Sequence, residues 1–207
     1  MDRKTITRAY SFEIRAENNE KNGDYITGKP IVYNSKTDLG YFDEIIEAGA
    51  LKESDLKDVR FLVNHNTDMI PLARSRNNNE NSTMQLEVDE NGMSIRVNLD
   101  TENNTEARNL YSAIKRGDIT GMSFMFTIDE ERWENLESEH PTRHIIKIGQ
   151  VFEVSAVTFP AYESTEISAR DKEALESAKT TLDSVRRQSL DSDEAALELE
   201  KAKNRNR

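Results

Sequence analysis

Apolar and polar side chains alternate at every second residue through much of this chain, and this alternation limits the folds open to it. The pattern is seen in TITRAYSFEIRA, in ITGKPIVYNS, and in two runs of TMQLEVDENGMSIRVNL separated by the turn residues Asn91 and Gly92. A period of two places alternate side chains on opposite faces of a strand, so each run predicts a half-buried β-strand. The last two runs predict a hairpin. We therefore expect a mainly β domain.

Other segments add further strands and a helix. DVRFLVNH predicts a strand ending at His65, and FMFTIDEERW and IGQVFEVSAV alternate on either side of an acidic stretch typical of a hairpin tip. TEARNLYSAIKR has the apolar spacing of one helix face, and Gly117 follows its last turn. GYFDEIIEAGAL has a shorter helix-like spacing before Gly49, and we interpret it as a short helix.

The composition changes at Asp171. The 207 residues suit one domain and an appendage. Glycine and proline are absent from Asp171 onward, and apolar residues recur at helical spacing at Leu175, Ala178, Leu182 and Val185. This spacing breaks at residues 189–193. We expect one folded domain over residues 1–170 and a helical or partly disordered tail of two short amphipathic helices over residues 171–207.

The residue types exclude several kinds of site. The chain has no cysteine, which excludes disulfides, thiolate nucleophiles and zinc–thiolate centres and fits a reducing cytosol. It has three histidines, at 65, 140 and 144, so a histidine-rich metal centre would need nearly all of them. We expect no metal and no other cofactor.

The charge and hydropathy indicate which partners to expect. The formal net charge is −11 and the sequence pI is near 4.9, whereas a nucleic-acid surface needs a concentrated basic face. No segment offers the roughly 20 apolar residues that span a bilayer, and the basic N-terminus is not followed by an apolar core. We expect a soluble, unexported protein that binds neither nucleic acid nor membrane.

One hydroxyl group lies inside an apolar strand pattern, at Ser123 in ITGMSFMF. A serine becomes a nucleophile when a base accepts its proton, and an imidazole with a pKa of about 6.5 can do this near neutral pH. His65 is the candidate base for Ser123. The alternative roles are structural: a strand serine often bonds to a neighbouring backbone group, and a histidine at a strand end can bond to a turn.

A nucleophile and a base need a third group that orients the imidazole. Glu153 lies in the apolar run VFEVSAVTFP, where an unpaired buried carboxylate would be unfavourable by several kcal/mol. A histidine would be a suitable partner for it. The alternatives are His144 and, more weakly, Asp68 for the orienting role, and a surface ion pair for Glu153.

Three segments in this order resemble the prohead proteases of tailed bacteriophages, which are serine proteases that mature capsids. They are NH at 64–65, GMSF at 121–124 and EVSAVTFPAY at 153–162. ITGKPIVYNS and FDEIIEAGAL resemble upstream parts of the same family, and the likeness covers about residues 1–170. This family is related to the herpesvirus assembly proteases (assemblins), which use a serine and two histidines.

The resemblance implies an α+β, mainly β fold: a closed antiparallel β-barrel surrounded by a few helices, followed by the helical tail. It implies Ser123 as nucleophile and His65 as general base. The phage branch places an acidic residue where the herpesvirus branch has a histidine, so we expect Glu153 as the third member and His144 as the second choice.

The resemblance also implies a substrate and a place of action. The substrate would be the scaffolding extension of the major capsid protein, cut inside the assembling prohead in the host cytoplasm. Self-association and self-cleavage of the tail are further expectations. The main alternative is a non-catalytic capsid assembly or scaffolding protein with the same fold. An unrelated acyl hydrolase ranks last, because Met125 replaces the second glycine of the G-x-S-x-G motif.

Overall fold

The computed structural model describes residues 5–10, 14–19, 23–159, 171–184 and 186–187. Its named elements, in chain order, are β1 (Thr5–Tyr10), β2 (Ile14–Asn19), β3 (Gly23–Val32), β4 (Lys36–Asp38), β5 (Asp43–Ile46), β6 (Asp58–Val63), β7 (Ala73–Arg76), β8 (Met84–Asp89), β9 (Gly92–Asn98), α1 (Thr105–Arg116), β10 (Gly121–Glu134) and β11 (Thr142–Val157). Residues 171–184 form a second helix. Among the described residues, no helix is both long and apolar enough to cross a bilayer.

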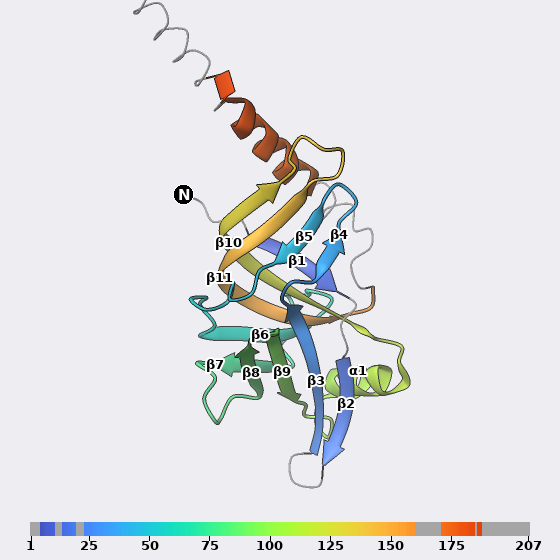
Figure 1. The fold of residues 1–207 in the computed structure, drawn as a ribbon. Helices are drawn as coiled ribbons and strands as arrows, with labels where there is room; N and C mark the ends of the chain where they lie inside the picture. Colours follow the sequence, from blue (N-terminus) through green and yellow to red (C-terminus); the bar gives the residue numbers. More distant parts are fainter. Residues whose placement is uncertain (1–4, 11–13, 20–22, 160–170, 185, 188–207) are drawn as a thin grey trace, which may run out of the picture.

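The strands form two sheets (Figure 1). The first has the order β1-β10-β11-β5-β4, and β6 pairs with both β11 and β7; the second has the order β2-β3-β9-β8. The 16-residue strand β11 pairs with β10 in the antiparallel direction and with two other strands in the parallel direction. Its first residues, Thr142–Ile145, pair with β5, and Glu153–Ala156 pair with β6. One strand therefore organises most of the larger sheet.

The prediction of a closed antiparallel barrel is wrong. Both sheets are open, and β11 pairs with β5 and β6 in the parallel direction. Closure would require a backbone ladder between the sheets, for example from β7 to β8. Instead, the backbone N–H groups of Arg74 and Arg76 bond to the hydroxyl groups of Thr83 and Ser82, at 2.8 and 2.9 Å. Side chains thus take up the donors that a continuous ladder would use.

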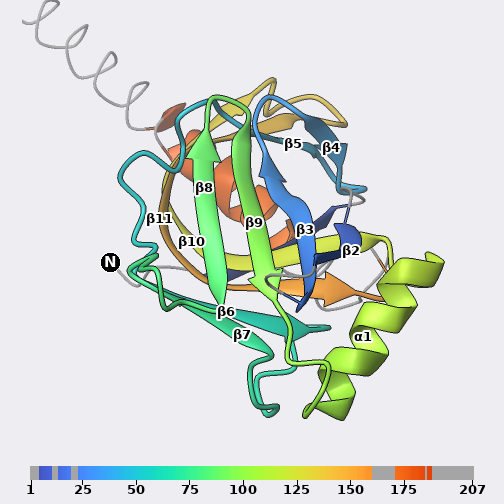
Figure 2. The ribbon, with the colours of Figure 1, turned by 90° about the horizontal axis from the view of Figure 1, so that it is seen from below.

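The hydrophobic core lies between the two sheets. Figure 2 shows the four-stranded sheet crossing β10 and β11, with α1 at one end. The fully buried core residues from β10 and β11 include Phe124, Phe126 and Val154, and those from the smaller sheet include Ile26 and Val97. The alternation read from the sequence therefore corresponds to one face packed on a shared core.

The predicted helix and hairpins are confirmed. Asn104 caps α1 by accepting bonds from the backbone N–H groups of Glu106 and Ala107, and Gly117 ends it in the left-handed conformation. At the β8–β9 turn, Gly92 has φ +140°, and a Cβ there would lie 2.0 Å from the carbonyl oxygen of Ile31. In the expected tail, residues 171–184 form a helix. Pro160 and the second tail helix lie outside the described residues.

The prediction of a short helix before Gly49 is wrong, because Asp43–Ile46 form the strand β5. Glu44 and Ile46 point inward and are 1% and 2% exposed. A period of two is present, but a carboxylate occupies one of its inward positions and hides the pattern.

A buried ionic cluster explains how Glu44 is tolerated there. The guanidinium of Arg8 bonds to Glu44 at 2.5 and 2.9 Å and to Asp171 at 2.9 Å. Arg143 approaches Glu44 at 3.5 Å. Burial raises the pKa of the Asp171 carboxyl, while the nearby Arg8 opposes that rise. The cluster joins β1, β5, β11 and the start of the helix at residues 171–184.

We expect Arg8→Met to lower the free energy of unfolding by about 3–5 kcal/mol, because it leaves buried carboxylates without their cation. The comparison is Arg116→Met, which removes only the exposed pair with Asp118 and should change stability little. Urea unfolding followed by circular dichroism measures both. Equal stability of the two variants would show that the cluster does not hold the fold.

Candidate active site

His65 lies just beyond β6 in an unusual backbone conformation. Asn64 and His65 have φ values of 51° and 56°, a left-handed pair that is unfavourable for residues other than glycine. The side chains of Asn64 and Thr158 bond at 3.0 Å, and the Thr158 N–H donates to the Asn64 side chain at 2.9 Å. This reciprocal contact holds the end of β6 against the end of β11.

The imidazole of His65 contacts the carboxylate of Glu153. Nδ1 of His65 lies 2.6 Å from Oε1 of Glu153. The Glu153 side chain is 3% exposed and that of His65 is 22% exposed. An ionised carboxylate only accepts hydrogen bonds, so in a neutral imidazole paired with it Nδ1 carries the proton and Nε2 keeps a lone pair. The parallel pairing of β6 with β11 brings these two residues together.

Ser123 lies on β10, next to this pair in the same sheet. It is opposite Ser155 of β11, which in turn is opposite Leu62 of β6. Its hydroxyl is fully buried and donates to the backbone carbonyl of Arg8 on β1, at 2.7 Å. This is the backbone bond that the structural alternative for Ser123 expected. A serine has one hydroxyl proton, so while Ser123 donates to Arg8 it cannot donate to His65 as well.

The other candidates for the third position lie elsewhere. Both ring nitrogens of His144 contact carboxylates, Nδ1 that of Glu47 at 2.6 Å and Nε2 that of Glu134 at 3.0 Å. His144 is in the part of β11 that pairs with β5, away from Glu153. Asp68 is exposed in the turn after His65, where its backbone N–H bonds to Asn66.

Ser155 is a residue of this site that the sequence reasoning missed. Its hydroxyl donates to Oε2 of Glu153 at 2.5 Å and accepts from the backbone N–H of His65 at 3.1 Å. A signal was available, because residues two apart in a strand share a face. Ser155 therefore points to the same side as Glu153.

An apolar hollow adjoins the strand end that carries His65. It has a volume of about 440 Å³ and lies between the end of β6, helix α1 and the residues leading into β10. Its apolar lining comes from Val63, Met69, Leu110, Ala113 and Ile119.

Among the described residues, Asp38, Asp43 and His140 could form a metal-binding group, but Lys36 and His140 already contact Asp43, at 2.5 and 3.2 Å.

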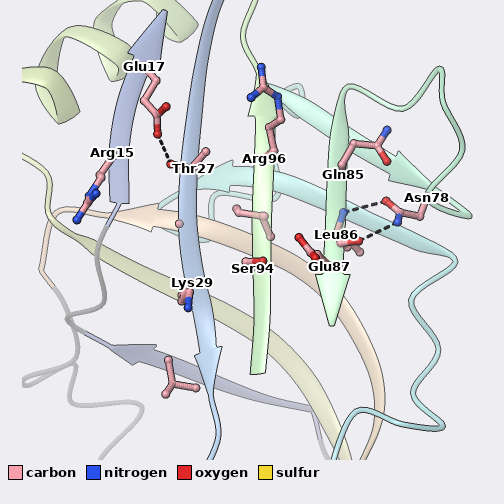
Figure 3. A pocket seen from close by; sticks show the side chains of 13 residues that line it. Arg15, Glu17, Thr27, Lys29, Asn78, Gln85, Leu86, Glu87, Ser94 and Arg96 are labelled. Atoms are coloured by element: carbon pink, nitrogen blue, oxygen red, sulfur yellow. Dashed lines mark hydrogen bonds between the residues drawn. The ribbon is translucent and has the colours of Figure 1, made fainter. Parts of the chain in front are cut away.

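A second cavity, of about 880 Å³, lies on the four-stranded sheet (Figure 3). Its lining carries charges of both signs, and Glu17 accepts bonds from Thr27 and Tyr25 at 2.8 Å each. Those bonds lower the pKa of the Glu17 carboxyl. None of Ser123, His65 and Glu153 lines this cavity. The groups that could perform acyl transfer are therefore on the other sheet.

One known protein family matches most of this chain. The sequence model described as "Caudovirus prohead serine protease" matches residues 10–181. No curated protein matches the chain. Among solved structures, the capsid assembly protease of bacteriophage T4 is similar at 14% identity and a TM-score of 0.39, over 74% of this chain and 99% of that one. That structural likeness is too distant to support an argument about this site.

The family match spans well over half of the chain, and it includes β10, β11, His65 and most of the helix that begins at Asp171. It confirms the resemblance read from the ordered segments around His65, Ser123 and Glu153. This chain belongs to the caudovirus prohead serine protease family.

Proposed function

We propose that this chain is a serine endopeptidase in which Ser123 is the nucleophile, His65 the general base and Glu153 the group that orients the imidazole. The contact of 2.6 Å between His65 and Glu153, beside the strand that carries Ser123, is the observation that supports this most strongly. The family supplies the reaction class.

The reaction follows from the chemistry of these groups. Nε2 of His65 accepts the Ser123 proton as the oxygen attacks a peptide carbonyl, and the imidazolium returns that proton to the leaving amine. Water then hydrolyses the acyl-enzyme by the same route. Glu153 keeps the proton on Nδ1 and stabilises the imidazolium that forms in each half of the reaction.

The substrates are the scaffolding extension of the major capsid protein and the chain itself. Cleavage takes place inside the assembling prohead, in the host cytoplasm. Residues 1–170 form the protease domain, and residues 171–207 are the tail that self-cleavage removes. Family membership supports the link to the prohead. Asp171, buried against Arg8, anchors the start of the tail on the domain until it is cut.

Confinement in the prohead raises activity through self-association. The Ser123 hydroxyl bonded to Arg8 represents a state that must rearrange before it can react. A site that is formed only part of the time works poorly in dilute solution but well beside its substrate at high effective concentration.

Ser123→Ala and His65→Ala should each abolish processing of the coexpressed major capsid protein, since losing such a group lowers turnover by about 10⁶-fold in serine proteases. Mass spectrometry of the capsid protein measures the cut. The matched controls are Ser94→Ala, on β9, and His140→Ala, at the hairpin tip; both should process normally. Processing by Ser123→Ala would rule out this nucleophile.

Glu153→Gln keeps the shape of the side chain but removes its charge, so cleavage of a capsid-derived peptide should fall by up to about 10⁴-fold. His144→Gln should retain most activity, because its ring contacts Glu47 and Glu134. Initial rates of the purified variants measure the difference. A larger loss for His144→Gln would give the orienting role to that residue.

The rate per molecule should rise with protein concentration if self-association completes the site. Peptide hydrolysis over a dilution series, with light scattering on the same samples, tests this. A rate per molecule that stays constant from dilute monomer to concentrated protein would contradict the role of self-association.

A further inference from the structure

Ser155 closes a ring of hydrogen bonds around the candidate histidine. Nδ1 of His65 contacts Oε1 of Glu153 at 2.6 Å, and Oε2 of Glu153 accepts from Ser155 at 2.5 Å. The Ser155 hydroxyl oxygen accepts from the backbone N–H of His65 at 3.1 Å. The ring therefore begins at the side chain of His65 and returns to the backbone of the same residue.

We propose that Ser155 is a positioning residue of this site, which sets the orientation of the Glu153 carboxylate and through it that of the His65 imidazole. This inference rests on the proposed function only for its effect on catalysis. The effect on the His65 side chain follows from the hydrogen bonds alone.

A buried carboxylate needs hydrogen-bond donors for its oxygens. Glu153 is 2% exposed, so water does not replace a lost partner at either oxygen. His65 occupies one oxygen and Ser155 the other. Without the Ser155 hydroxyl, Oε2 loses this hydrogen-bond donor. The carboxylate is then stabilised by a rotation that lets both of its oxygens share the remaining donor, the Nδ1–H group of His65. Such a rotation moves the acceptor that holds the imidazole.

The backbone of His65 also bonds to Ser155. A residue at φ 56° is held by its surroundings rather than by its own preference. Ser155 accepts its N–H while Thr158 holds the preceding Asn64. The same hydroxyl thus fixes the main chain of His65 and the group that orients its side chain.

Ser155 differs from Ser123, the proposed nucleophile, in the partners of its hydroxyl. The two serines lie opposite each other on β10 and β11, and both are fully buried. Ser155 gives its proton to a carboxylate and accepts from the His65 backbone, so it is not directed at Nε2 of the imidazole. It holds the base while Ser123 supplies the reacting oxygen.

The test uses the full chain with Ser155→Ala, Ser155→Thr and the control Ser75→Ala. Thr retains the hydroxyl and should restore the function that Ala loses. Ser75 is a fully buried strand serine on β7 whose hydroxyl has no hydrogen-bond partner within the described part of the chain. Its replacement removes the same atom without breaking a bond. Capsid-derived peptide hydrolysis, thermal unfolding and proton NMR are measured for each variant.

We expect Ser155→Ala to lower kcat by about 10- to 100-fold, by analogy with the loss seen when an outer partner of a metal-binding histidine is removed, while KM stays nearly unchanged. The downfield Nδ1–H resonance of His65, identified by its loss in His65→Ala, should shift or broaden. Ser155→Thr and Ser75→Ala should keep kcat close to the wild-type value. If Ser155→Thr does not fold, the resonance in Ser155→Ala decides.

A folded Ser155→Ala protein with wild-type kcat and an unchanged His65 resonance would overturn the proposal. So would a loss of activity that only matches a loss of folded protein. If the wild-type protein cleaves nothing, the proposed function fails, but the His65 resonance still tests whether Ser155 positions the imidazole. The two failures are therefore distinguishable.

Discussion

The pairing of β11 with β10 on one side and β6 on the other is the constraint on which the site depends. The register places Ser123 opposite Ser155 and Ser155 opposite Leu62, three residues before His65. Glu153, one period earlier on β11, reaches the imidazole at 2.6 Å. A shift of one residue in either ladder would turn these side chains to the other face of the sheet. The fold therefore positions the candidate groups through backbone hydrogen bonds.

Arg8 connects this site to the end of the domain. Its carbonyl oxygen accepts the Ser123 hydroxyl, and its guanidinium lies between Glu44 and Asp171. Buried ion pairs of this kind tolerate little change in one partner, because the other is left without compensation. The position of β1, and with it the hydrogen bond to Ser123, is thus linked to the helix at residues 171–184.

Much of the local structure could be predicted, because α1 and the hairpins follow from spacing and turn residues. β5 was missed because Glu44 occupies an inward position and its partner Arg8 lies far away in sequence. Whether the sheets close into a barrel depends on how their edge strands meet, and no pattern within one strand reveals this. Glu153, and not His144, contacts His65 because β6 and β11 pair in the parallel direction. The spacing of residues in the sequence does not reveal that pairing. Ser155 could have been noticed from the period of two, but its backbone partner at His65 could not.

Ser123 is the proposed nucleophile, although its hydroxyl is buried and bonded to Arg8. The most direct measurement is the reaction of concentrated protein with a fluorophosphonate, followed by peptide mapping of the adduct. We expect one adduct, on Ser123, that disappears when His65 is replaced. An adduct on Ser155 or another serine, or labelling of Ser123 that does not require His65, would contradict it.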